Sequence, residues 1–180
     1  MRLDRDTKYK GLVGRTHTAA GDLFFVLPQT YMNRSGQSVV PLARFFRIEP
    51  EQILVVHDEL DLAPGTARLK LGGGIAGHNG LRDVAEQSGS KEFWRLRLGI
   101  GHPGDRNRVA DWVLSSPSVE DRIDIELAID RSLDVMSQIV SGDMQGAMLK
   151  LHGVAKPPKV PKPPKPATTA PAAPSAPKGE

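Results

Sequence analysis

Hydrophobic and polar positions along the chain form blocks that predict strands and helices in turn. Alternating or continuous apolar runs, typical of strands, cover residues 11–17, 22–27, 53–56, 66–71 and 94–100. Apolar positions with helical spacing cover residues 35–47, 79–88, 109–114, 119–140 and 144–151. Because strands and helices alternate, and because a strand–helix–strand unit favours a parallel crossover, we expect an α/β fold.

The composition changes at residue 156. Residues 156–180 are rich in Pro, Ala and Lys and have no apolar periodicity. We therefore expect a single folded domain over residues 1–155, followed by an extended or disordered tail. The tail holds five lysines and one glutamate, which leaves 19 of the 24 basic and 20 of the 21 acidic side chains in the domain. Any attraction of the folded part to nucleic acid must then come from a local patch.

The lack of cysteine, of long apolar runs and of an apolar N-terminus excludes several classes of protein. The chain has no cysteine, which excludes a disulfide framework and a zinc–cysteine cluster and is typical of a reducing compartment. No apolar run reaches the ~18 residues of a membrane span. The first residues, MRLDRDTKYKG, are charged and lack the apolar centre of a signal peptide. We expect a cytoplasmic protein with no membrane segment.

Three consecutive glycines, residues 72–74, separate a predicted strand from a predicted helix, and Gly77, His78 and Asn79 follow them. Such a run costs backbone entropy, so it indicates either torsions that other residues avoid or a partner close to bare backbone. At a helix start, free amides and the positive dipole end favour an anionic, polar ligand. The alternative is a simple turn, with Asn79 as the helix N-cap.

A second polar run, HDELD at residues 57–61, follows a predicted buried strand. In open α/β sheets, residues just past the carboxyl end of a strand line the ligand crevice. The run permits three hypotheses: a metal site, a solvated acidic turn, or a catalytic carboxylate. We consider a metal site the weakest, because no second cluster with ligand spacing exists in the sequence. Asp58 is the residue that would orient an imidazole as a catalytic carboxylate.

Four further side chains are candidates for substrate contacts. Asn33 could polarise a carbonyl or bind a water, and Tyr31 could stack on a base or sugar. Lys70 and Arg97 could hold a phosphate. Taken singly, each has a plainer interpretation as a turn residue, a core aromatic or a solvated surface charge.

Four runs of the sequence, in their order and spacing, resemble bacterial peptidyl-tRNA hydrolases from about Tyr9 to Leu151. The runs are PQTYMNRSG, ARFFRIEPEQILVVHDELDLAPG, LKLGGGIAGHNGLRD and FWRLRLGIGHPGDRN. The resemblance implies a three-layer domain with a mixed, twisted sheet flanked by helices. It also implies an enzyme that cleaves the ester between peptide and tRNA and so recycles tRNA from stalled or aborted translation. Such an enzyme uses no metal or cofactor and acts as a cytoplasmic monomer, with peptidyl-tRNA and stalled complexes derived from the ribosome as partners.

The resemblance assigns binding roles to five residues. Three match positions that hold the peptidyl-tRNA 3′ end and a water: Tyr31, Asn33 and Asn79. Two match a clamp for the tRNA 5′ phosphate: Lys70 and Arg97.

The catalytic positions show one departure. By resemblance, Asp58 supports a catalytic histidine, and His78 lines the site. The family opens with a strand that carries an Asn, followed by a Thr-Arg-His-Asn run whose histidine is the general base. This sequence contains no such run, and none of its five histidines matches that base. We therefore expect that the first, central strand is missing from the sheet and that Asp58 has no imidazole to orient.

Three functions remain open at this point. The leading hypothesis is an esterase acting on peptidyl-tRNA. The second is a catalytically inactive, tRNA-binding remnant of the same fold. The third is a structural adaptor whose Pro/Lys tail binds partners.

Overall fold

The computed structural model describes residues 1–153, and the predicted tail at residues 156–180 lies outside them. The strands are β1 (Asp4–Asp6), β2 (Gly11–Thr18), β3 (Gly21–Pro28), β4 (Leu54–Glu59), β5 (Ala67–Leu71) and β6 (Trp94–Gly99). The α-helices are α1 (Gly36–Phe45), α2 (Asn79–Ser88), α3 (Val109–Leu114), α4 (Val119–Leu133), α5 (Met136–Val140) and α6 (Met144–Gly153). Three 3-10 turns are η1 (Met32–Arg34), η2 (Pro50–Gln52) and η3 (Arg106–Arg108).

Two three-stranded sheets organise the chain. In one, β6 lies between β4, which is parallel to it, and β5, which is antiparallel. In the other, β1, β2 and β3 form an antiparallel meander. The predicted α/β fold is confirmed, but the prediction of one sheet is wrong for residues 1–153. Strands β3 and β4, which α1 connects in the chain, do not pair with each other. Strand β3 pairs with β2, and β4 pairs with β6.

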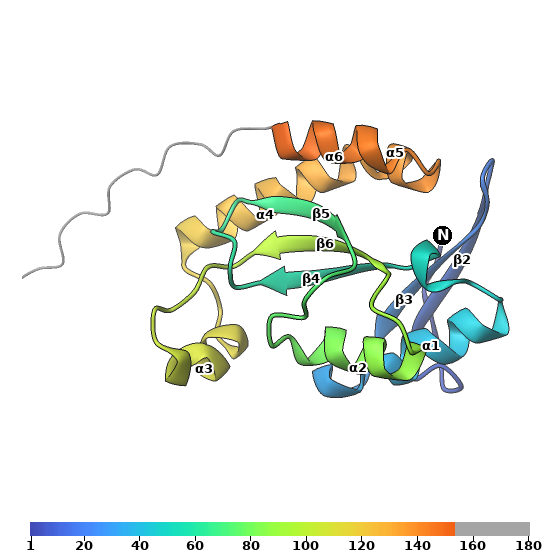
Figure 1. The fold of residues 1–180 in the computed structure, drawn as a ribbon, viewed down its shortest axis with the longest axis horizontal. Coiled ribbons are helices and arrows are strands. Elements are labelled where there is room, and N and C mark those ends of the chain that lie inside the picture. The colour runs from blue at the N-terminus through green and yellow to red at the C-terminus, as the bar shows by residue number, and fades with distance from the viewer. Residues whose placement is uncertain (154–180) are drawn as a thin grey trace, which may run out of the picture.

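Helices cover both faces of the mixed sheet, which makes the predicted three layers (Figure 1). On one face α4, α5 and α6 bury an apolar cluster against β5 and β6 (Ala67, Leu69, Leu96, Ala128, Val135, Ala147 and Leu151). On the other face α2 buries a second cluster (Leu81, Val84, Ala85 and Phe93). Burial of this apolar surface is the main force that holds the helices on the sheet.

Two predicted boundaries differ from the structure. Strand β4 continues through His57 and Asp58, so both side chains belong to the strand end and do not start a loop. The long helix predicted over residues 119–140 is divided into α4 and α5 at Asp134 and Val135. The turn places Val135 in the core, with 1 % of its surface exposed, while the preceding Leu133 stays 62 % exposed.

A histidine near the end of α6 covers the outer edge of the mixed sheet. The amide of Leu69 in β5 donates to His152 Nε2 at 2.9 Å, and Arg68 Nη1 donates to the His152 carbonyl at 3.0 Å. Burial, with a smaller effect of the Arg68 charge, lowers the pKa of His152. The unprotonated ring therefore satisfies a backbone donor of an edge strand, which would otherwise lack a partner.

The lowered pKa of His152 predicts a loss of stability in acid. The folded state binds the proton less readily than the unfolded state, so the free energy of unfolding is highest above the ordinary value of 6.5 and falls as the pH drops below it. In His152→Gln the amide oxygen can still accept from Leu69 but does not titrate, so part of the acid loss should disappear. Urea unfolding from about pH 8 to about pH 5 measures this. The same loss in both proteins would refute the role of His152.

Candidate active site

Asp58, at the end of β4, contacts the residue that precedes α2. His78 Nε2 lies 3.2 Å from Asp58 Oδ1, and the two side chains are 14 % and 36 % exposed. Asp58 therefore has an imidazole beside it, that of His78, which is not the general base that the resemblance implies. The contact joins a strand end to a helix start, which is where an open α/β sheet forms its ligand crevice.

The same imidazole caps α2. His78 Nδ1 accepts hydrogen bonds from the amides of Gly80 at 3.1 Å and Leu81 at 3.2 Å. His78, and not Asn79, is thus the N-cap, and it satisfies two amides that have no partner inside the helix. Because Nδ1 accepts two bonds, it carries no proton, and the proton sits on Nε2 and is donated to Asp58. Both nitrogens are committed, so this ring orients a carboxylate and is not free to take a proton.

The electrostatics of the pair favour an ionised Asp58. The hydrogen bond from His78 lowers the pKa of Asp58, and this effect exceeds the opposing effect of burial. A carboxylate with a lowered pKa is charged at neutral pH. The strand end therefore holds a fixed negative charge that is still partly open to solvent.

A second histidine lies behind this pair. His57 is 8 % exposed, its Nδ1 is 2.6 Å from the Asp58 carbonyl, and its ring meets the His78 ring edge to face at 5.0 Å. Its Nε2 has no hydrogen-bond partner among the described residues. Burial lowers the pKa of His57, and the neighbouring His78 contributes in the same direction. A neutral ring here adds no positive charge beside Asp58.

The side chain of Arg95, in β6, binds the glycine loop, which is residues 72–74. This guanidinium is 2 % exposed and donates to the carbonyls of Gly74 at 2.5 Å and Gly73 at 3.1 Å. Gly72 and Gly73 have φ values of +58° and +93°, which other residues rarely adopt. The run of glycines thus gives the loop the torsions that turn its carbonyls onto the buried arginine.

The two candidate phosphate ligands lie on the α2-facing side of the mixed sheet but in different environments. Arg97 Nε donates to Glu59 Oε2 at 2.8 Å, and the Glu59 side chain is only 7 % exposed. Burial raises the pKa of Glu59, but the Arg97 hydrogen bond and the Asp61 amide outweigh it, and the net shift is downward. Lys70 is exposed and lies beside the glycine loop, since a Cβ on Gly73 would be 2.8 Å from its Nζ. Lys70 is therefore the more accessible cation.

The two candidate carboxamides come from adjacent elements. Asn79 is the first residue of α2, and its Oδ1 accepts from Arg82 at 3.3 Å. Asn33 lies in η1, which packs against α2, since a Cβ on Gly80 would be 2.7 Å from the sulfur of Met32. The structure thus brings η1 next to the residues that follow His78.

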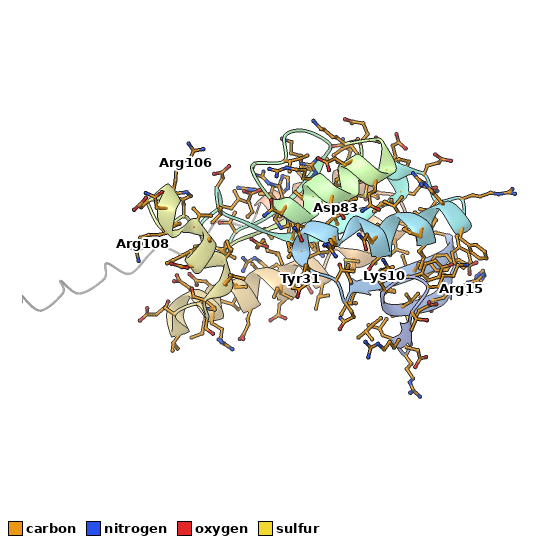
Figure 2. The ribbon with its side chains drawn as sticks, turned by 90° about the horizontal axis from the view of Figure 1, so that it is seen from below. Lys10, Arg15, Tyr31, Asp83, Arg106 and Arg108 are labelled. Carbon is orange, nitrogen blue, oxygen red and sulfur yellow. The ribbon has the colours of Figure 1, made fainter. Side chains whose placement is uncertain are left out.

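Tyr31 precedes η1, is 79 % exposed, and lies near the middle of the face that Figure 2 shows. Within residues 1–153, no group of three or more His, Asp or Glu side chains is placed to hold a metal ion. The candidate site described above offers carboxylate, imidazole and carboxamide groups.

Two residues of this site were not singled out from the sequence. Arg95 alternates with apolar residues in β6, which favoured a solvent-facing side chain, and His57 was included only in an acidic run. One signal could have found Arg95. The carbonyls of a glycine loop beside a sheet need hydrogen-bond donors, and an arginine on that sheet can supply them. For His57 the signal was its place in the HDELD run, just past a predicted strand, where a ligand crevice is expected.

The family model described as peptidyl-tRNA hydrolase matches residues 1–159. The chain belongs to this family.

Relatives and solved structures agree with the family. A peptidyl-tRNA hydrolase of Leptothrix cholodnii is 54 % identical over 158 residues, which cover 88 % of this chain and 73 % of the relative. One of Variovorax paradoxus is 52 % identical over 159 residues, covering 88 % and 75 %. The crystal structure of peptidyl-tRNA hydrolase from Acinetobacter baumannii superposes with a TM-score of 0.80 at 46 % identity, covering 83 % of this chain and 76 % of that one.

Removing the His78 imidazole should change both the helix and the carboxylate. In His78→Ala, the loss of the cap should lower the free energy of unfolding by about 1 kcal/mol. Without the hydrogen bond, the pKa of Asp58 should rise toward its ordinary value of 3.8. Urea unfolding and ¹³C NMR titration of the carboxyl group measure the two effects. His102→Ala, in an exposed loop, is the control, and an unchanged Asp58 pKa in His78→Ala would contradict the assignment.

Proposed function

We propose that this chain hydrolyses the ester bond between peptide and tRNA in peptidyl-tRNA, and so recycles tRNA from stalled or aborted translation. The observation that carries the proposal is the Asp58–His78 contact at the tip of β4, next to Asn79, in a member of the peptidyl-tRNA hydrolase family. Relatives at about half identity carry that enzyme's name.

The side chains of the site suit ester hydrolysis. Carboxamide N–H groups of Asn33 and Asn79 can donate to the ester carbonyl as negative charge develops on it, or hold the attacking water. The carboxylate of Asp58 stabilises a positive charge that forms beside it, and His78 keeps that carboxylate in position. The exposed ring of Tyr31 offers a stacking surface for the terminal base or ribose.

We propose further that the general base is a histidine that this sequence does not supply. Both nitrogens of His78 are committed, and His57 is buried. Strand β4 forms a ladder on one side only among the described residues, and Val56 in its middle is 56 % exposed. By the resemblance, the family's first strand, and with it the segment bearing the base, fits against that edge.

The proposed partner is peptidyl-tRNA, and stalled complexes derived from the ribosome are a further proposal. We propose that Lys70 and Arg97 hold the tRNA 5′ phosphate, with the exposed Lys70 as the main contact and the less exposed Arg97 as the second. We propose a cytoplasmic monomer, which a chain without cysteine suits. Within residues 1–153 no helix combines the length and the apolar character needed to cross a membrane.

The test is turnover of an N-acyl-aminoacyl-tRNA by the chain as it stands, which without that base should be about 10²- to 10⁴-fold slower than turnover by a relative that carries it. Release of deacylated tRNA supports the proposal. Binding of tRNA without release would instead identify a catalytically inactive tRNA-binding protein, and absence of both would defeat the proposal.

Asn79→Ala should lower turnover about a hundredfold, because one positioned donor to the developing oxyanion is lost. Unfolding should change little, since the side chain is exposed. Asn107→Ala, in an exposed turn, is the matched control. Equal turnover of the two variants would remove Asn79 from the site.

Lys70→Ala should weaken tRNA binding and reduce the slope of log affinity against log salt by about one, because one phosphate contact releases fewer counterions. Lys70 is preferred to Arg97 for this test, since Arg97→Ala would leave the buried Glu59 unpaired and destabilise the fold. Fluorescence anisotropy with labelled tRNA over a salt series measures the slope. Arg122→Ala on α4 is the control, and an unaltered slope in Lys70→Ala argues against the clamp.

A further inference from the structure

The two candidate carboxamides lie at or just before the start of a helix, and those two helices pack against each other. Asn33 lies in η1, three residues before Gly36, the first residue of α1. Asn79 lies four residues, about one turn, before Asp83 in α2. The distance between the two carboxamides therefore depends on how the first turn of α1 is held against α2.

Asp83 makes the directional contact between these two turns. The amide of Gly36 donates to Asp83 Oδ2 at 2.7 Å. Gln87 Nε2 lies 2.9 Å from both oxygens of the same carboxylate and so fixes its orientation. The cap of α1 is thus supplied by another helix, since Ser35 at the N-cap position donates its hydroxyl to the Met32 carbonyl instead. Figure 2 shows Asp83 on α2 where that helix meets α1.

The contact brings the two backbones close together. A Cβ on Gly36 would lie 2.6 Å from the Asp83 carbonyl oxygen and 2.9 Å from Asp83 Oδ2. No side chain fits there, so glycine sets the spacing of the helices at this point. A carboxylate at the first turn of a helix also interacts favourably with the free amides and the dipole.

Other contacts hold the rest of the helix pair. Arg44 Nη2 donates to the Gln87 carbonyl at 2.7 Å at the far end of α1, and Met32 packs on Gly80 near the site. Removal of the Asp83 carboxylate should therefore leave α1 attached while its first turn, and η1 before it, gain freedom.

We infer that Asp83 is a positioning residue for ester hydrolysis. It fixes the start of α1, and with it Asn33, relative to Asn79. The inference rests on the proposed function, because it assumes that both carboxamides hold the same ester. Small displacements of positioning groups cost rate more than affinity, so the effect falls on kcat more than on KM.

A double-mutant cycle tests this inference. Asp83→Ala should lower kcat for N-acyl-aminoacyl-tRNA about tenfold with little change in KM. In the Asn33→Ala background the same substitution should have almost no further effect, because the group that Asp83 positions is gone. Asp83→Asn, which keeps an acceptor for the Gly36 amide, should recover part of the loss. Asp130→Ala, on the exposed side of α4, is the control.

The outcomes separate this inference from the proposed function. An equal loss of kcat from Asp83→Ala in both backgrounds would show a general structural role and overturn the inference. Absence of turnover in the unsubstituted chain would count against the proposed function alone. NMR then still decides the positioning role: the side-chain amide signals of Asn33 should shift and broaden in Asp83→Ala, while those of Asn107 do not. Unchanged Asn33 signals would overturn the inference whether or not the chain turns over.

Discussion

One imidazole joins the two halves of the candidate active site. His78 uses Nδ1 to cap α2 and Nε2 to bind the carboxylate of Asp58. The helix start and the strand end cannot separate without breaking one of these contacts. The cap also decides the chemistry, because it keeps the ring proton on the nitrogen that faces Asp58. The carboxylate stays charged, and the imidazole acts as its holder.

A buried cation supports the same region from the other side. Arg95 donates to two carbonyls of the glycine loop, and that loop leads directly to His78. Burial lowers the pKa of Arg95, but the guanidinium remains protonated because its ordinary pKa is so high. The two hydrogen bonds hold carbonyls that lie four and five residues before His78. The glycines adopt backbone torsions that other residues avoid, and the arginine binds the carbonyls that these torsions direct toward it.

Local signals in the sequence predicted the helices well. The predicted bounds of α2 and α3 agree with the structure, because apolar spacing, a glycine stop and turn residues act within each segment. Contacts between distant segments were not readable in the same way. Asn79 is a better N-cap than histidine by general preference, yet His78 takes that place because Asp58 holds its ring. Arg95 is buried because a loop folds onto it, and alternation alone favoured solvent. The turn at Asp134 depends on the space that the core leaves for Val135.

The sheet shows the same division between local and distant information. Each of the five strands predicted in the domain forms, but the ladder that would join β3 to β4 is not present among residues 1–153. Strand pairing depends on which edges meet in three dimensions, and apolar patterning does not encode this directly. Candidate site residues were found where a motif stood next to a strand end or a helix start. A residue that acts through another side chain, such as Asp83, carries no such mark.

The protonation of the His78 ring tests the central claim most directly. Long-range ¹H–¹⁵N NMR of the imidazole near neutral pH distinguishes the two nitrogens. The account predicts an unprotonated Nδ1, an Nε2 that carries the proton, and no exchange with the other tautomer. A proton on Nδ1, or a ring that exchanges freely between tautomers, would contradict it, because neither can cap α2 and hold Asp58 at once.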